Sequence, residues 1–230
     1  MDIFNSKYTA EDLENAVGAV LAPFEEGRKA EREHFWDIYQ DYGRRTVYNQ
    51  YTGAFLGSAW TDENFNPKYP IAPTDASYMF RQTGITDLTK EGVVLDFSQC
   101  TKFNYAFAYN DIKKLPFIDL SKAVDTTDAF NNIDCESMHL KFSEATNIAS
   151  GMFYQVIYLV NLRIEGTIAK SISFSYSNLL STDAVQSVID HLKDLTGQTA
   201  QTVTFHATVG NNMTAAQKAE ITAKNWTLVY

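Results

Sequence analysis

Residues that commonly carry chemistry are scattered along this sequence. The four histidines are far apart and form no HxxxH or HxH pattern: His34, His139, His191 and His206. We interpret each as a surface or edge histidine rather than a metal ligand. No GxSxG, P-loop or GxGxxG motif occurs, which removes the usual signals of hydrolases and nucleotide-binding proteins. Composition alone leaves a glycosidase pair of carboxylates open. We expect no enzyme, and assign no catalytic, cofactor-binding or metal-binding residue and no cofactor.

A repeated unit of about 23 residues organises the middle of the chain. Small residues lead into a phenylalanine in four copies: Phe80, Phe107, Phe130 and Phe153. A strand-like triplet follows each of them: 95–97, 118–120, 140–142 and 162–164. Stacking apolar-polar-apolar triplets would build a continuous core. We therefore expect an α+β fold, a short leucine-rich-repeat-type solenoid of about four coils with N-terminal helices and a C-terminal α/β cap.

The repeat columns also suggest a structural role for both cysteines. Cys100 shares its column with Ala123 and Ala145, whereas Cys135 shares one with Ile85 and Ile112. Such columns suit small or apolar buried side chains. The two cysteines also lack metal-ligand spacing. We therefore expect buried thiols without redox or metal chemistry.

The central residues of the four triplets are charged. They are, in chain order, Asp96, Asp119, Lys141 and Arg163. We interpret them as a mixed ladder of cross-strand ion pairs on a solvated face, in preference to a catalytic site.

The flanks of the repeat predict helices and a closing module. Residues 8–42 carry two apolar stripes at helical spacing, which we interpret as packing faces in preference to a self-association seam. A homotrimer formed through residues 10–42 stays an open hypothesis. Towards the C-terminus we expect a helix capped at Thr182-Asp183 and stopped near Gly197, a strand around 203–205, a helix from Thr214 and a strand at 226–230. The predicted organisation is an N-terminal attachment region with connector (1–70), a solenoid (71–180) and a capping module (181–230).

Charge and hydropathy narrow the classes of partner. The net charge of −9 disfavours nucleic acid and anionic membranes as partners. No apolar stretch approaches the ~18 residues of a membrane span, and the first residues show no signal-peptide pattern. We expect synthesis in a cytoplasm and no membrane insertion.

The repeat resembles the BspA-like leucine-rich repeats of bacterial surface proteins. The resemblance rests on the Ala/Met-Phe lead-ins, the triplets Leu-Asp-Phe-Ser and Ile-Asp-Leu-Ser, and the period. The C-terminal segment from Leu179 is similar to the closing module of repeat proteins in phage tails and other virion components. The resemblance implies a tail-associated virion protein, structural or receptor-binding, with other virion proteins or a cell-surface protein or glycan as partners. The alternative is a bacterial cell-surface adhesion module that binds a host protein or glycan.

Overall fold

The computed structural model describes residues 51–67 and 70–230. The predicted N-terminal helices and the trimer hypothesis for residues 10–42 lie outside the described residues. The chain divides into two units, Met1–Arg45 and Thr46–Tyr230, and the following description concerns the second unit.

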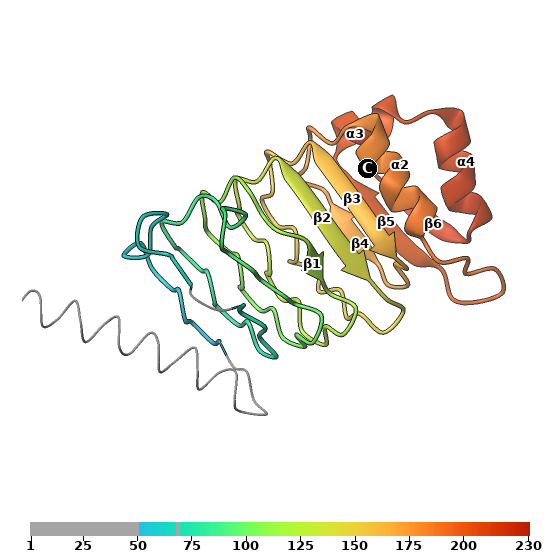
Figure 1. Cartoon of the computed structure of the whole chain (residues 1–230). Coiled ribbons are helices and arrows are strands. Elements are labelled where there is room, and N and C mark those ends of the chain that lie inside the picture. Colours follow the sequence, from blue (N-terminus) through green and yellow to red (C-terminus); the bar gives the residue numbers. More distant parts are fainter. Residues whose placement is uncertain (1–50, 68–69) are drawn as a thin grey trace, which may run out of the picture. The chain divides into compact units, whose positions relative to one another are not determined.

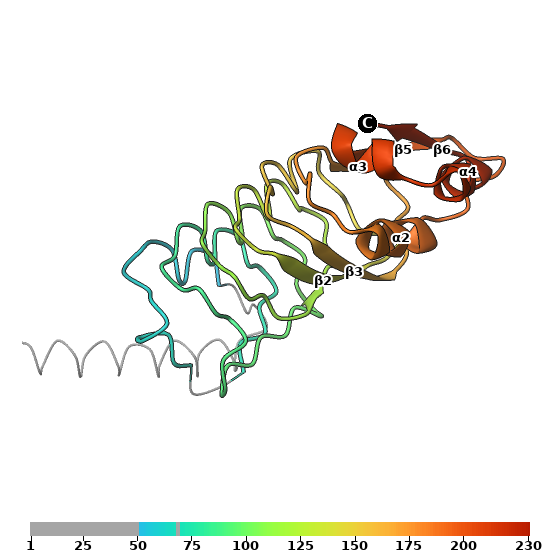
Figure 2. The same ribbon diagram turned by 90° about the horizontal axis from the view of Figure 1, so that it is seen from above.

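Two small parallel sheets and three helices make up the regular structure (Figure 1). The first sheet has the order β1-β2-β3, with β1 at Ile118–Asp119, β2 at Ser137–Phe142 and β3 at Asn161–Gly166. The second has the order β4-β5-β6, with β4 at Ile172–Phe174, β5 at Gln201–Phe205 and β6 at Trp226–Val229. The helices are α2 at Thr182–His191, α3 at Ala207–Asn212 and α4 at Ala215–Ala223. The two sheets lie on opposite sides of this unit (Figure 2).

This architecture corrects the predicted fold class. A leucine-rich-repeat-type solenoid of about four coils requires a strand from each copy in one sheet, whereas the described residues form two separate three-stranded sheets. The first triplet, 95–97, forms no strand and makes only an isolated bridge from Leu95 to Ile71. The strands in the first sheet are unequal in length, because β1 has two residues and only β2 and β3 extend to six. The strands at 172–174 and 203–205 pair in the other sheet instead of extending the first.

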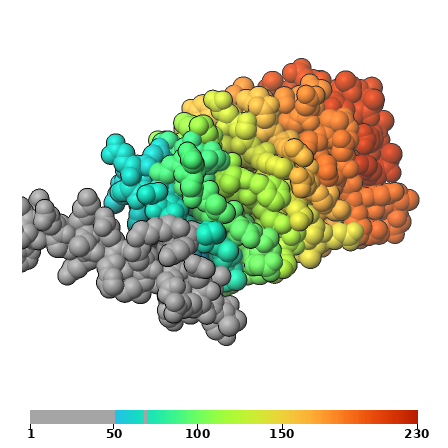
Figure 3. All heavy atoms as spheres, in the orientation of Figure 1, coloured from blue at the N-terminus to red at the C-terminus, as the bar shows by residue number. Residues whose placement is uncertain are grey.

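The repeated segments around the phenylalanine anchors fold as turns rather than as regular strands. The N–H groups of the first three phenylalanine anchors each donate to a carbonyl on the following copy: Phe80 to Ala106 (2.8 Å), Phe107 to Ala129 (2.8 Å) and Phe130 to Met152 (3.0 Å). Further N–H groups on either side of the anchors continue the ladder. Successive copies therefore lie side by side in sequence order, which is also visible at the surface in Figure 3. The backbone polar groups of the turns are satisfied without regular strands.

A column of stacked phenylalanines forms the core beneath these turns. Its members are Phe55, Phe80, Phe107, Phe130, Phe153, Phe174 and Phe205, all buried. Consecutive ring centroids lie 4.8 to 5.9 Å apart. Aromatic pairs at this separation add about 0.5–1.5 kcal/mol each beyond the burial of area. The column passes from the turns into the second sheet, because Phe174 ends β4 and Phe205 ends β5.

The turns have an unusual backbone on both sides of the column. The residues two positions before and two positions after the anchors have φ between +51° and +59° at Tyr78, Gln82, Tyr105, Tyr109, Asp128, Asn132 and Gln155. Around Phe55 the equivalent positions are Gly53 and Gly57, also at positive φ. The turns around Phe55, Phe80, Phe107 and Phe130 therefore use the left-handed region at both positions, whereas Gly151, two residues before Phe153, has no positive φ.

The C-terminal module agrees with its predicted helices, with corrections at the ends. The N-cap of α2 is Ser181 rather than Thr182-Asp183, and the helix ends at His191, before Gly197. The capping box at Thr214 and Gln217 is confirmed. The α2 helix packs against β3 (Figure 2). Within the described residues, no helix has the length and apolar character needed to cross a bilayer.

Candidate functional site

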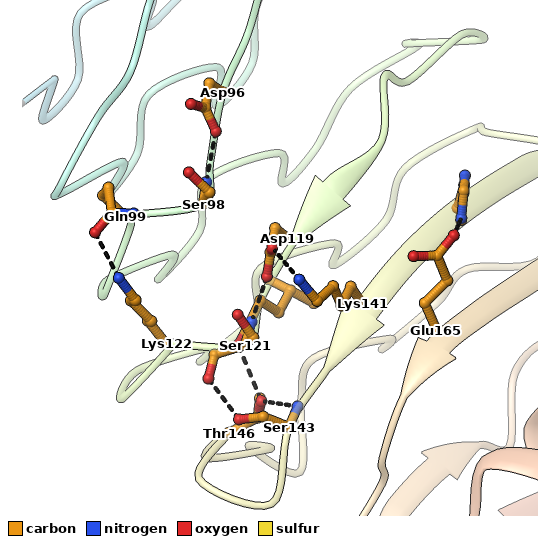
Figure 4. A network of polar contacts seen from close by, with 12 residues as sticks. Asp96, Ser98, Gln99, Asp119, Ser121, Lys122, Lys141, Ser143, Thr146 and Glu165 are labelled. Carbon is orange, nitrogen blue, oxygen red and sulfur yellow. Dashed lines mark hydrogen bonds and ion pairs between the residues drawn. The ribbon is translucent and has the colours of Figure 1, made fainter.

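The charged residues at the centres of the triplets form hydrogen bonds and ion pairs with other residues of the fold. Lys141 Nζ lies 2.9 Å from Asp119 Oδ2, which confirms one cross-strand ion pair of the predicted ladder (Figure 4). The ladder of cross-strand ion pairs does not continue to the other two triplets. The Asp96 carboxylate accepts a hydrogen bond from the Ser98 N–H, and Arg163 pairs with Glu165 on the same strand. Burial raises the pKa of Asp119, but hydrogen bonds from the next serine and from Lys141 outweigh it and leave the pKa below its ordinary value. This face is a structural network.

Each histidine in the described part of the chain has a local partner. His139 Nε2 lies 2.8 Å from a Glu165 oxygen, and His191 Nδ1 lies 2.8 Å from a backbone carbonyl one helical turn earlier. His206 is the N-cap of α3, where its Nδ1 accepts from the Thr208 N–H. His34 lies outside the described residues. Across residues 51–67 and 70–230, no group of three or more His, Cys, Asp or Glu side chains could hold a metal ion.

The predicted burial of both cysteines is confirmed. Cys100 and Cys135 are fully buried and free. Burial raises the pKa of Cys100 to about 12 and also raises that of Cys135, so neither thiol is activated as a nucleophile. One member of the repeat column predicted to share burial with Cys100 was wrong: Ala145 is exposed, and the next residue, Thr146, is buried in its place. The Thr146 hydroxyl donates to a backbone carbonyl at 2.9 Å, and this hydrogen bond offsets the free-energy cost of burying the hydroxyl.

The sequence reasoning missed a surface cluster around one arginine. The Arg81 guanidinium lies over three tyrosine rings, 5.9 Å from the centroid of Tyr78, 5.7 Å from Tyr105 and 5.3 Å from Tyr109. The first two rings stack on each other with centroids 5.3 Å apart and planes 7° from parallel. We call these four residues the Arg81 cluster. Tyr78 and Tyr105 each lie two positions before a phenylalanine anchor, and this shared offset is a signal that could have been found in the sequence.

A second aromatic cluster follows further along the same turns. Tyr154 comes directly after its anchor and Tyr176 two residues after the next, with ring centroids 4.6 Å apart. Both are well exposed, at 42% and 37%. A hollow of about 500 Å³ lies beside Tyr176, lined by Ile157, Tyr158, Ser175, Asn178, Leu179 and His206. We call Tyr154 and the residues of this hollow, Tyr176 included, the Tyr154 cluster, and the two clusters together the tyrosine strip.

The repeat register connects the two clusters. Tyr109, Asn132 and Gln155 occupy the same position, two residues after the anchor, on successive turns. The Asn132 N–H donates to Tyr154 O at 2.8 Å, so the turn between the clusters is bonded directly to the second one. Residues with amide side chains, which can donate and accept hydrogen bonds, therefore occupy this register position on the two turns that follow Tyr109.

The backbone at the strip gives no reason for the tyrosines. A bulky L-residue in the left-handed region costs roughly 1–2 kcal/mol, whereas glycine and asparagine adopt it readily. Tyr78, Tyr105 and Tyr109 have φ of 57°, 54° and 59°. Glycine and asparagine occupy equivalent positions on neighbouring turns without this cost. Strain of this kind often marks a functional site, and here it points to a use for the side chains themselves.

Comparison with known proteins identifies no family for the chain. No protein-family model, curated protein or solved structure matches it. The resemblance to BspA-like repeats therefore stays a prediction, as does the division into 1–70, 71–180 and 181–230.

Proposed function

We propose that this protein is a non-catalytic binding protein that contacts a protein or a glycan through its tyrosine strip. The observation that carries the proposal is the row of exposed and half-buried tyrosines, of which Tyr78, Tyr105 and Tyr109 are held at unfavourable positive φ. Tyrosine and arginine are enriched at binding hot spots, because a rigid amphipathic ring supplies much contact area at a small entropic cost. The strip combines both residue types with amide side chains.

The Tyr154 cluster adds exposed apolar surface to the strip. Ile157, Tyr158 and Leu179 are 43%, 45% and 49% exposed, and they surround the hollow beside Tyr176. Contiguous exposed apolar surface with a polar rim is typical of interaction sites. The hollow is open and shallow, which suits a side chain or a single sugar ring better than an enclosed small molecule.

We propose a phage virion as the setting, with the protein associated with the tail and either structural or receptor-binding. The resemblance of the repeat and of the C-terminal segment to such proteins supports this setting. The partners would be other virion proteins or a cell-surface protein or glycan. The alternative is a bacterial cell-surface adhesion module, which would use the same strip on a host protein or glycan. The net charge of −9 disfavours nucleic acid as a partner in either setting.

Two measurements test this proposal. Binding to an array of glycans and surface proteins should give a specific signal that Tyr176→Ser abolishes. Phe117→Ser is the matched control, because Phe117 is 40% exposed but precedes β1 and contacts His139 outside the strip. An unchanged signal in the Tyr176 variant would refute the role of the strip. Mass spectrometry of purified phage particles should detect the protein, and its absence there would refute the virion setting.

A further inference from the structure

Among the described residues, Arg81 has no carboxylate partner, unlike Lys102 and Lys114 in neighbouring copies. Neighbouring copies pair Lys102 with Asp75 (3.5 Å), and Lys114 with Asp87 (2.7 Å). Among residues 51–67 and 70–230, by contrast, Arg81 forms no ion pair with any acidic side chain, and its Nε is buried without a hydrogen-bond partner. The chain carries 28 Asp and Glu residues against 19 Lys and Arg. An arginine left without a carboxylate in so acidic a chain is available to an external anion.

The three tyrosine rings prepare the guanidinium for such a ligand. Ring faces attract the cation and fix its plane, while its N–H groups point along the edge of that plane. A guanidinium held in this way matches a carboxylate, which can accept two parallel hydrogen bonds. The stacked pair Tyr78 and Tyr105 limits the motion of Arg81 before any ligand arrives, which lowers the entropic cost of binding.

A carboxylate of the protein stands at the far edge of the same cluster. The nearby Asp128 carboxylate raises the pKa of the Tyr105 phenol. Asp128 also accepts from Asn131 Nδ2 at 2.9 Å. Gly151 on the next turn leaves room for it, since a Cβ there would lie 2.5 Å from Asp128 Oδ1. The carboxylate thus has a fixed position beside the rings and retains capacity to accept from ligand hydroxyls.

These features select the class of ligand. The cluster has one cation, and Asp128 beside it repels a second negative charge, so densely charged phosphate polymers are poor ligands. A ligand with one carboxylate and several hydroxyls uses the guanidinium, the Asp128 acceptor and the ring faces together. We infer that the Arg81 cluster binds the carboxylate of an acidic saccharide, of the uronic or sialic acid type. This inference rests on the proposed function, whose ligand it specifies.

The probes are galacturonic acid, glucuronic acid and sialyllactose, each with one carboxylate and each compared with its methyl ester, by isothermal titration calorimetry on the full chain. At least one acid should bind, and its ester should bind at least tenfold more weakly, because the ester keeps the ring and hydroxyls but loses the charge. Arg81→Gln should abolish the preference for the acid, and Arg81→Lys should lose most of it, since lysine lacks the bidentate fork. Arg163→Gln, a change at an exposed arginine outside the strip, should leave binding unchanged.

Three results would overturn the inference: equal binding of acid and ester, binding unaffected by Arg81→Gln, or no binding of any of the acids. The comparison of acid with ester uses the unaltered protein, so a folding defect of a variant cannot imitate the expected result. Each of these failures leaves the array signal of the Tyr176→Ser experiment untouched. If the Tyr176→Ser variant instead gave the same array signal as the original protein, the proposed function itself would be refuted.

Discussion

The replacement of Tyr109 by asparagine or alanine would measure the strain stored in the strip. Tyr109 has φ +59° and its side chain is 39% exposed, so both variants lose a comparable buried part of the ring and the contact with Arg81. The two variants differ in the backbone, because asparagine tolerates the left-handed region and alanine does not. Asn132 occupies the equivalent position on the next turn at φ +54°, which shows that asparagine fits this turn.

The expected magnitudes follow from these terms. The buried part of the ring contributes about 1–2 kcal/mol, and the cation–π contact about 0.5–1 kcal/mol. Relief of the backbone offsets roughly 1–2 kcal/mol of this loss in Tyr109→Asn. The asparagine variant should therefore lose about 1 kcal/mol or less, whereas Tyr109→Ala should lose about 2–3 kcal/mol. The difference of about 1 kcal/mol in favour of the more polar residue is the diagnostic quantity.

Urea denaturation with equal m values for the three proteins would measure both losses. An alanine variant as stable as the asparagine variant, or more stable, would refute the argument that the turn disfavours ordinary side chains. In that case positive φ would no longer single out the tyrosines as functional.

Three further predictions concern the framework that holds the strip. Phe107→Ala in the middle of the phenylalanine column should cost about 3–5 kcal/mol in urea denaturation, and a loss below 1 kcal/mol would contradict the column as the core. Gly166→Ala should cost about 3 kcal/mol or more, because a Cβ at this positive-φ position would overlap the carbonyl that ends β2. Gly92→Ala, also at positive φ but with open space around it, is its control and should cost only about 1–2 kcal/mol; equal losses would refute the predicted overlap. The hydrogen bond from Lys114 lowers the pKa of the Asp87 carboxyl from 3.8 to about 2. The stabilisation that the ionised carboxylate contributes should therefore be fully present above about pH 4 and should be lost as the pH falls towards 2. Asp87→Asn should flatten that fall in unfolding midpoints measured against pH, and an unchanged profile would contradict the assignment.

The repeat period and much of the core could be predicted because they depend on residue type alone. Regular spacing identified Phe80, Phe107, Phe130 and Phe153, all of which are buried in the column. Phe55 was missed because the segment around it reads as an irregular connector. The fold class was wrong because a triplet indicates alternation but neither strand length nor strand partner: 95–97 forms no strand, and 172–174 and 203–205 pair in a separate sheet.

The strip was harder to predict because backbone conformation is not visible in residue type. Nothing in tyrosine suggests a positive φ, and only alignment with Gly53 and Gly57 reveals the shared requirement. The aromatic content of the chain is evident from its composition, but composition does not separate buried phenylalanine from exposed tyrosine. Offsets from the anchors do separate them: the anchor is buried, whereas Tyr109 and Tyr176, each two positions later, are exposed.

The most direct test of the strip is the affinity of a double variant, Tyr154→Ser with Tyr176→Ser, for the glycan or protein that gives the strongest array signal. Hot-spot side chains contribute about 2 kcal/mol or more each, so the loss of both should raise the dissociation constant roughly a thousandfold. Phe117→Ser should leave it within twofold of the original value. A double variant that binds as tightly as the original protein would contradict the account, because the exposed tyrosines would then not be the contact surface.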